Sequence, residues 1–343
     1  MATAATEAPA RIGRTMCPRD AWVVGAASIA GPTENRGPLR GRFDEVCADH
    51  LLGCRSWEGA ETEMQRRALA RLCASLHLER QDFDLLLAGD LLNQTAASAF
   101  AAREADVPFC GLYNACATFC EGLGLAAVLC ASGCCRRVAV VVSSHHDAAE
   151  RQYRFPTELG SQRPPSAQWT ATGAVAVAVE AGAADRAGVR IEAFTPGRVV
   201  DYRLKDPFQM GEAMAPAAAD TLAAHLGDLG RAPQDYDAVH TGDLARIGRP
   251  ICEELLAERG IEVRLRDCGC ELYLPSHQDV HAGGSGAACS ALVFAASILP
   301  GLVAGTTRRA CLCATGALHS PTSYQQGESI PAVAHAVSLA ASR

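Results

Sequence analysis

Runs of apolar residues alternate along the chain with stretches in which apolar positions recur at helical spacing. The runs contain small and β-branched residues and almost no charge, which predicts strands buried on both faces. In the first half of the chain the predicted strands are 21–28, 83–90, 107–109, 137–144 and 172–179. Between them, residues 60–76 have the pattern of an amphipathic helix, and shorter helices are predicted at 95–103 and from Cys116 onward. Strands that alternate with helices predict an α/β fold with parallel pairing.

The second half of the chain repeats this alternation. Its predicted strands are 190–194, 198–202, 236–240, 261–265 and 311–315, and its predicted helices are 216–226, 250–259 and 287–298. We therefore predict a flexible tail over residues 1–20 and two halves, 21–184 and 185–343. Because the halves share no evident sequence repeat, we expect them to be similar in structure alone.

Composition and charge narrow the class of protein. Hydrophobic residues make up 49% of the 343 residues and aromatic residues 5%, which favours close packing through small side chains. With 31 Lys and Arg against 38 Asp and Glu, the formal charge is -7, which argues against a nucleic-acid partner. The first residues lack the apolar segment of a secretory signal, so we expect a cytoplasmic protein. Residues 282–307 carry no charge, but glycines and prolines interrupt them, which predicts a buried helix rather than a membrane span.

The sixteen cysteines do not have the spacing of a structural zinc site, because no Cys-x-x-Cys pair occurs. Cys268 and Cys270 are one residue apart, as are Cys311 and Cys313, which predicts that each pair lies on one face of a strand. Most of the cysteines are expected to be buried free thiols in a reducing compartment. We predict neither a metal site nor a cofactor.

Cys116 lies where the predicted strand 107–109 leads into a helix of small residues. A helix N-terminus stabilises a thiolate and lowers its pKa, so Cys116 is a candidate nucleophile or part of an anion-binding corner. The alternative is a packing cysteine on a core helix. Asn114 either supplies a donor to a ligand or closes the turn.

Two further groups of polar residues follow the central strand 137–144. His145 and His146 come directly after it, at the edge of a parallel sheet where active groups collect, although such histidines also bind local backbone groups. The polar segment 147–170 is long enough to suggest a functional loop. It supplies Arg151, Arg154 and Arg163, which are suited to binding carboxylates or to forming ion pairs with neighbouring glutamates such as Glu150 and Glu158.

Several long motifs carry a resemblance to a known family. They are AERQYRFP at 149–156, GSQRPP at 160–165, AQWTATGA at 167–174, AMAPAAADT at 213–221 and QDVHAGGSG at 278–286. With these motifs the chain resembles the stage V sporulation protein AD branch of the thiolase superfamily, over about residues 22–318. The resemblance implies a five-layer αβαβα fold made of two similar halves.

The resemblance also implies a function. This branch is thought to bind dipicolinic acid (pyridine-2,6-dicarboxylate), either free or as its calcium salt, and to take part in its uptake into the developing spore without processing it. The implied partners are other stage V sporulation A membrane proteins and a second copy of the chain, paired through the first-half sheet. The implied location is cytoplasmic, at the periphery of the forespore inner membrane.

A condensing enzyme related to β-ketoacyl synthase III needs a His and an Asn beside its cysteine. By position these residues fall at Thr241 and Gly284, while His240 lies one residue earlier and is expected to point to the other side of its strand. We therefore expect no enzymatic activity. The alternatives are an acyltransferase or condensing enzyme that uses Cys116, and a scaffold for membrane proteins.

A planar dianion needs cationic or N–H donors for its carboxylates and a flat apolar slot for its ring. The acidic residues Asp243 and Asp279 would repel it, unless they hold the arginines or bind an accompanying calcium ion, for which no loop has the usual ligand spacing. The candidate ligand-binding residues are Asn114, Cys116, His145, His146, Arg151, Arg154, Arg163, Thr241, Asp243, His281, Gly284 and Ser285.

Overall fold

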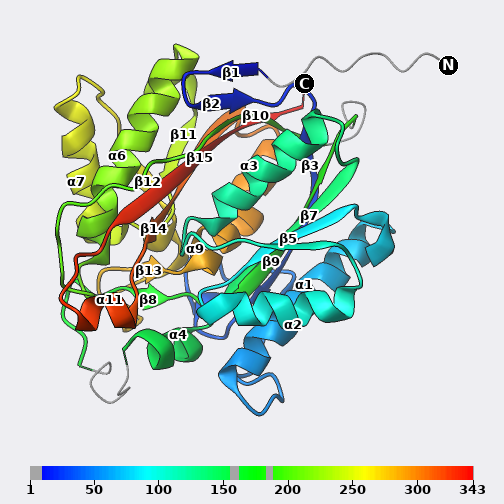
Figure 1. Cartoon of the computed structure of the whole chain (residues 1–343), viewed down its shortest axis with the longest axis horizontal. Coiled ribbons are helices and arrows are strands. Elements are labelled where there is room, and N and C mark those ends of the chain that lie inside the picture. Colours follow the sequence, from blue (N-terminus) through cyan, green and yellow to red (C-terminus); the bar gives the residue numbers. More distant parts are fainter. Residues whose placement is uncertain (1–9, 155–161, 183–187, 343) are drawn as a thin grey trace.

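Three layers of helices enclose two layers of β-strands in the computed structural model, which describes residues 10–154, 162–182 and 188–342 (Figure 1). One outer layer contains α1 (Trp57–Leu76) and α2 (Ala96–Ala105), and the other contains α6 (Met210–Leu229) and α7 (Ala245–Ala257). Between the two sheet layers lie α3 (Thr118–Ala131) and α9 (Ala287–Val293). The predicted five-layer αβαβα architecture is confirmed.

The strands of the first sheet layer are largely those that the apolar runs predict. Their order is β3 (Trp22–Ala30), β9 (Gly173–Glu180), β7 (Arg137–Ser144), β5 (Leu85–Gly89) and β6 (Phe109–Gly111). The short strand β4 (Glu45–Val46) pairs in parallel with the end of β3. β9 is antiparallel to both β3 and β7, whereas β7, β5 and β6 are parallel. Every residue of β7 and β9 is buried, because helices cover both faces of this layer.

The second sheet layer differs more from the prediction. Its order is β10 (Val189–Thr195), β15 (Ala332–Ala341), β14 (Arg309–Ala317), β11 (Ala238–Thr241) and β12 (Arg266–Asp267). The alanine-rich strand β15 was not predicted, because alanine favours a helix more than a strand. The strand predicted at 261–265 is wrong, since Ile261 and Val263 pack against the core from a segment without strand pairing. Of the strand predicted at 198–202, a single bridge between Val200 and Ala332 is found.

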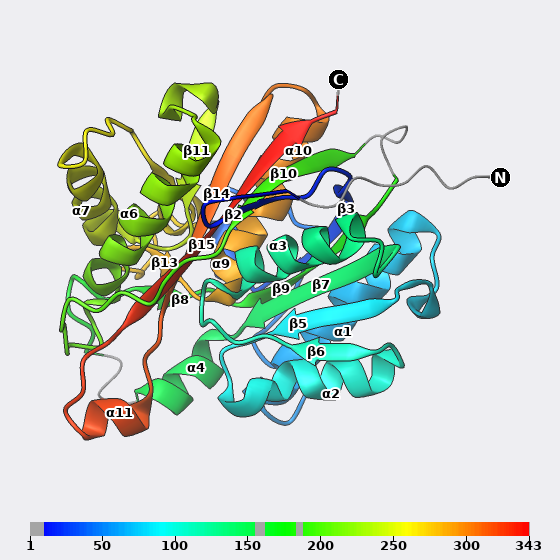
Figure 2. The ribbon, with the colours of Figure 1, turned by 45° about the horizontal axis from the view of Figure 1, so that its top comes forward.

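The predicted flexible tail is wrong for residues 10–17, which form the hairpin of β1 (Ala10–Ile12) and β2 (Thr15–Cys17). The hairpin lies against β10 (Figure 2), and Met16 pairs with Phe194 there. Asp228 fixes the turn by accepting hydrogen bonds from the backbone of Arg14 and Thr15. The acceptor lies more than 200 residues away, so no local pattern predicts this anchor. The halves 21–184 and 185–343 remain a prediction, and hydrogen bonds from β10 to both β3 and β15 join their sheets.

Small residues let the central helices lie between two sheets. A Cβ atom on Gly124 of α3 would come within 2.1 Å of the Phe194 ring of β10, so this contact requires glycine. After α9, a π-helical turn (Phe294–Ile298) and α10 (Leu299–Val303) continue the uncharged segment, confirming a buried helix with a glycine-rich start. No helix among the described residues is both long and apolar enough to cross a membrane.

The cysteine predictions have two outcomes. Cys311 and Cys313 lie on β14 and point into one core cluster, as their spacing predicts. Cys268 and Cys270 instead belong to the short helix α8 (Cys268–Leu272), so the strand interpretation is wrong there. All sixteen thiols are free.

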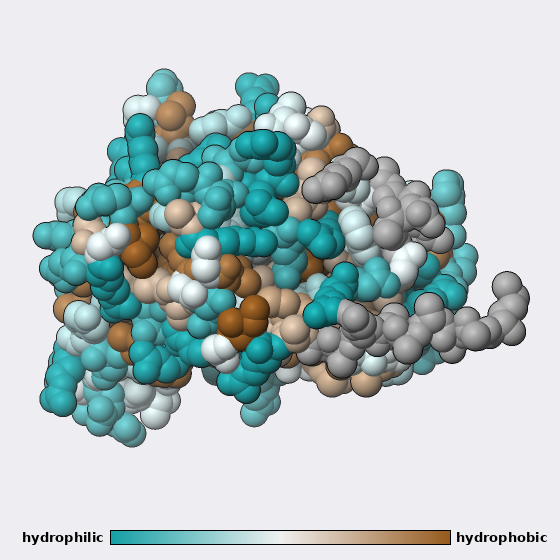
Figure 3. All heavy atoms as spheres, turned by 90° about the horizontal axis from the view of Figure 1, so that it is seen from above, coloured by the Kyte–Doolittle hydropathy of each residue, from teal (hydrophilic) through white to brown (hydrophobic). Residues whose placement is uncertain are grey.

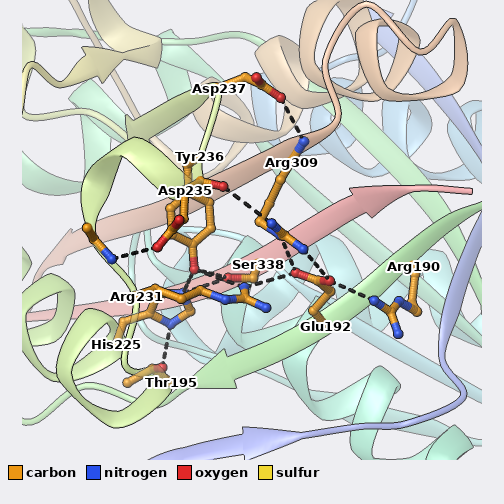
Figure 4. A network of polar contacts seen from close by, with 11 residues as sticks. Arg190, Glu192, Thr195, His225, Arg231, Asp235, Tyr236, Asp237, Arg309 and Ser338 are labelled. Carbon is orange, nitrogen blue, oxygen red and sulfur yellow. Dashed lines mark hydrogen bonds and ion pairs between the residues drawn. The ribbon is translucent and has the colours of Figure 1, made fainter.

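A polar network connects β10, α6, β14 and β15 in the second half of the chain (Figure 4). Glu192 accepts hydrogen bonds from Arg231 and Arg309, and the resulting positive surroundings lower its pKa despite burial. Beside it, the buried ring of His225 bonds with Thr195 and Ser338. The face of the molecule shown in Figure 3 is largely hydrophilic, with hydrophobic atoms in small patches.

Candidate functional site

A small, mainly apolar pocket with a cavity volume of about 40 Å³ opens at the carboxyl ends of β5, β7 and β14. Short elements close it: α4 (His146–Tyr153), the extended pair β8 (Trp169–Thr170) and β13 (Gly284–Ser285), and the segment after β14. Its lining residues are Leu91, Ala115, Cys116, Ala149, Tyr153, Arg154, Thr170, Met210, Ser285, Ala317 and His319. The pocket is therefore where strand topology places functional groups in an α/β protein.

Cys116 lies at the pocket on a tight loop, two residues before α3 begins at Thr118. The preceding residue, Ala115, has a left-handed backbone (φ 49°), a conformation that non-glycine residues rarely adopt. Thr118 stabilises the loop, because its hydroxyl donates to Ala115 O over 2.7 Å and accepts from Asn114 N. A Cβ atom on Gly316 would come within 2.3 Å of Asn114 O, so β14 must approach this loop through a glycine.

Asp243 and Ser285 are the polar side chains that influence the Cys116 thiol in the described part of the chain. The Asp243 carboxylate lies near enough to the thiol to raise its pKa. The Ser285 hydroxyl lies 3.8 Å from the sulfur and donates to Asp243 Oδ2 over 3.0 Å. Thr315 Oγ1 donates to Asp243 Oδ1 over 2.5 Å, so hydroxyl donors hold both carboxyl oxygens.

Burial decides the protonation states of this pair. It raises the pKa of Cys116 well above that of a free thiol, and the nearby Asp243 carboxylate raises it further. Burial also raises the pKa of Asp243 to about 6, against the lowering effect of its hydroxyl donors. The prediction that a helix N-terminus lowers the pKa of Cys116 is thus wrong, because Cys116 precedes the helix and desolvation outweighs the dipole.

Thr241 does not contact Cys116. Its hydroxyl donates to Asp267 Oδ2 over 2.7 Å, and the same buried carboxylate accepts from Leu244 N and Ala245 N. Asp267 therefore fixes the loop that carries Asp243, and Thr241 helps to position that loop. The side chain from this loop that lies near the thiol is Asp243, two residues after Thr241.

A side chain at position 284 would also face away from the thiol. A Cβ atom at this position would come within 2.7 Å of the Tyr273 ring and 3.1 Å of Cys289 Sγ. Side chains alternate along β13, so the neighbouring Ser285 points to the pocket instead. His240 is buried on β11, 3.8 Å from a carboxylate oxygen of Glu271, and is not among the residues that line the pocket.

Arg154 is the cationic side chain of the pocket lining. Its guanidinium forms an ion pair with Glu150, one turn earlier, and lies 5.3 Å from the centre of the Phe208 ring. Its Nε atom is buried and has no hydrogen-bond partner among the described residues. The same is true of His319 Nε2, and burial together with Arg154 lowers the pKa of that histidine to about 4. The pocket thus combines a charged donor with a neutral imidazole.

Beside the pocket, three side chains form a stack at the start of the motif 167–174. The rings of His146 and Trp169 are parallel at 3.5 Å, and the Arg163 guanidinium lies 4.9 Å from the Trp169 ring centre. Burial and the charge of Arg163 lower the pKa of His146 to about 3. His146 and Arg163 are near the site but do not line the pocket.

The other predicted residues lie outside the lining. Arg151 is exposed on α4 and pairs with Glu58, and His281 pairs with Asp279 at 2.9 Å. Asn114 uses its backbone N–H to bond the Thr118 hydroxyl. His145 is buried at the start of α4 and its Nε2 is 2.7 Å from His50 O. Glu158, a suggested partner of the arginines, lies outside the described residues.

Sequence reasoning missed several lining residues. His319 follows β14, and the rule that functional groups follow strands would have singled it out. Tyr153 lies in a recognised motif, and its hydroxyl bonds with Leu91 O and the Tyr113 hydroxyl. Met210 and Ala317 carry no sequence signal, because apolar residues look alike whether they line a pocket or fill a core.

Five alternating layers of helices and strands, with a cysteine loop at the central helix, define a thiolase-like protein. Solved structures with this fold include a cerulenin-bound OleA of Xanthomonas campestris, 16% identical with a TM-score of 0.60 over 96% of this chain and 99% of that one. Another is 3-oxoacyl-(acyl carrier protein) synthase III of Pseudomonas aeruginosa, 17% identical with a TM-score of 0.53 over 95% and 99% of the chains. At this identity the likeness shows the fold alone.

The particular family follows from sequence. Residues 14–340 match the family model of stage V sporulation protein AD. The protein of that name from Bacillus subtilis (strain 168) is 43% identical over 318 residues, 92% of this chain and 93% of the relative. The chain therefore belongs to the stage V sporulation protein AD family. It is a sporulation-family protein on a fold shared with condensing enzymes.

Proposed function

We propose that this protein binds dipicolinic acid in the pocket beside Cys116, without catalysing a reaction, and takes part in its uptake into the developing spore. The observation that carries the proposal is the pairing of Cys116 with Asp243. A nucleophilic cysteine is activated by a lowered pKa, whereas burial and the nearby Asp243 carboxylate raise the pKa of this thiol. The pocket is formed, but the thiol at its base is not activated.

The chemistry of the lining supports the ligand class. Leu91, Met210 and three alanines offer apolar walls to an aromatic ring. Arg154 offers a guanidinium whose Nε has no partner, and such a group binds carboxylates strongly when it is desolvated. The Ser285 and Thr170 hydroxyls add neutral polar groups to the lining. The enclosed volume is about 40 Å³, so the lining side chains must move apart to admit the ligand.

Calorimetric titration with dipicolinate tests the proposal directly. We expect saturable heat at one site per chain, and weaker binding of pyridine-2-carboxylate, which lacks one of the two charged groups. Repeating the titration with calcium shows whether the free dianion or its calcium salt is preferred. Absence of heat at millimolar dipicolinate, with and without calcium, would refute the proposal.

The alternative function is an acyltransferase or condensing enzyme that uses Cys116, favoured by the fold shared with synthase III and OleA. Intact mass measurement after incubation with acyl-CoA donors separates the two. An acyl adduct that disappears in Cys116→Ser would support the enzyme. We expect no adduct.

We further propose that two copies of the chain pair through the first-half sheet. β6 lies at the edge of this sheet, and its one strand partner in the described part of the chain is β5. Cys110 on β6 is exposed, so its strand is open to pairing with another chain. Sedimentation should show a dimer that Cys110→Pro converts to a monomer, and a dimer unaffected by this substitution would exclude the β6 edge.

Location at the forespore inner membrane is proposed to come from contacts with other stage V sporulation A membrane proteins. Membrane fractions from sporulating cells that lack those proteins should then lose this chain. Retention in such fractions would point to direct binding of lipid instead.

A further inference from the structure

His50, His145 and Asp147 form a cluster behind α4, outside the pocket lining. His145 ends the connection from β7, Asp147 lies in the first turn of α4, and His50 comes from the loop before α1. One side-chain ligand atom from each lies within 4.8 Å of the others. Asp147 Oδ2 is 3.6 Å from His50 Nδ1 and 3.9 Å from His145 Nδ1.

The surroundings of His145 fix which ring nitrogen faces the cluster. Its Nε2 is 2.7 Å from His50 O, and a carbonyl oxygen only accepts, so Nε2 carries the proton. Nδ1 then holds the lone pair and lies 3.9 Å from Asp147 Oδ2. Histidines that bind metal ions typically donate their second N–H to a backbone carbonyl in this way. The contact that Nδ1 makes with Ala148 N, at 3.5 Å, is at the outer limit for a hydrogen bond.

His50 supplies the second observation. Its Nδ1 is buried and has no hydrogen-bond partner among the described residues, although the histidine is one of the more exposed members of the cluster. A buried polar atom without a partner is uncommon in a folded protein and points to an absent bound group. Asp147 is the carboxylate that faces it, and a cation between the two would satisfy both.

We propose that His50, His145 and Asp147 bind one divalent transition-metal ion of the zinc class. Two imidazole nitrogens and a carboxylate are typical donors for such ions, whereas calcium and magnesium prefer oxygen alone. At bonds of roughly 2.0–2.1 Å, neighbouring tetrahedral ligands lie about 3.4 Å apart. The observed 3.6 and 3.9 Å to Asp147 are a few tenths of an ångström longer, and the two histidine nitrogens, which lie within 4.8 Å of each other, must also close to this spacing. The fourth coordination position of the metal ion would be open to water, because His50 and Asp147 are about one-third exposed.

The site would tie the loop that carries His50 to the start of α4. This helix also carries Ala149 and Tyr153 and ends at Arg154, all three of which line the pocket. Metal binding would therefore stiffen one pocket wall. The effect on the pocket depends on the proposed function, but metal binding itself does not.

Cobalt titration of the metal-free full-length protein tests the site. Cobalt reports its ligands by visible absorption, and thiolate ligands would add a separate charge-transfer band, which distinguishes this site from the sixteen cysteines. We expect one equivalent of Co²⁺ with nitrogen and oxygen ligands, displaced by Zn²⁺ but not by Ca²⁺. Metal binding should also raise the melting temperature.

His50→Gln and Asp147→Asn are the informative variants, because both residues are partly exposed and neither supports the core. Each should weaken Co²⁺ binding at least roughly tenfold while the variant stays folded. His277→Gln, at an exposed histidine, is the matched control and should bind like the parent. The proposal is overturned if the parent binds no equivalent of Co²⁺, if its spectrum shows thiolate ligands alone, or if both variants bind as tightly as His277→Gln.

Discussion

The Ser285 hydroxyl lies 3.8 Å from the sulfur of Cys116 and donates a hydrogen bond to the buried carboxylate of Asp243. Burial raises the pKa of the Cys116 thiol, and the nearby carboxylate raises it further. We therefore expect the thiol to stay protonated near neutral pH and to contribute shape to the pocket rather than a nucleophile.

Low reactivity of Cys116 is the first prediction. At pH 7.5, alkylation with iodoacetamide followed by peptide mass mapping should modify the exposed Cys134 first. Cys116 should react much more slowly although it lines the pocket, because its pKa is raised and the thiolate is the reactive form. Asp243→Asn should speed its modification. Faster labelling of Cys116 than of Cys134 would show an activated nucleophile.

Dipicolinate affinity should depend on pH through Asp243. The pKa of this carboxyl is raised to about 6, so it is neutral below that pH and charged above it. A charged carboxylate near the pocket repels a dianion, and binding should weaken as the pH rises from 5.5 to 7.5. Titration of Asp243→Asn over the same range provides the control. Its affinity should vary less with pH than that of the parent, and equal slopes would exclude Asp243 as the cause.

Acid should destabilise the fold through His225, which burial keeps neutral with a pKa of about 4 (Figure 4). In the unfolded chain a histidine has a pKa of about 6.5, so between these values the unfolded state binds more protons. The stability that the neutral ring contributes is fully present above pH 6.5 and is lost as the pH falls toward 4. One such histidine accounts for ~3 kcal/mol of the free energy of unfolding.

Urea unfolding of the parent and of His225→Gln at pH 7.0 and 4.5 measures this contribution. The other buried histidines are present in both proteins and cancel in the comparison. The free energy of unfolding should fall less in the variant between the two pH values. An equal loss in both proteins would mean that His225 is already protonated in the folded state.

Gly316→Ala should disturb the cysteine loop. The added Cβ would lie 2.3 Å from Asn114 O and 3.1 Å from Ala117 N, so the backbone of the loop must move. We expect a destabilisation of about 1–3 kcal/mol, typical of overpacking, together with weaker dipicolinate binding. Gly227→Ala is the control, because a Cβ there meets no atom within 4 Å. Similar thermal unfolding of the two variants would show that the loop adapts.

Much of the fold was predictable because its strands are uniformly apolar and bounded by turn residues. Every residue of β7 and β9 is buried, and the apolar sequences of these strands predict this burial. β15 was missed, since Ala332–Ala341 satisfies a helix pattern as well as a strand, and its place between β10 and β14 is decided by long-range pairing. The β1–β2 hairpin depends in the same way on a distant residue, Asp228.

The site was predictable in its position and less so in its contacts. Cys116, Arg154 and Ser285 were expected and do line the pocket. Thr241 and Gly284 were assigned to the site by their positions along the sequence. In the structure, Asp267 accepts hydrogen bonds from the loop after β11 and holds it so that Asp243 lies near the thiol instead. Which residue of a loop reaches a pocket depends on hydrogen bonds that sequence spacing does not show.

The central claim is that the pocket binds dipicolinate through Arg154. The most direct test compares the dissociation constants of Arg154→Gln and Arg151→Gln by calorimetry. Both residues belong to the α4 segment and form an ion pair with a glutamate, but Arg154 lines the pocket and Arg151 is exposed. We predict that Arg154→Gln weakens binding by about 1.5–3 kcal/mol, as expected for a charged hydrogen bond, while Arg151→Gln binds like the parent. Equal affinity of the two variants would contradict the account.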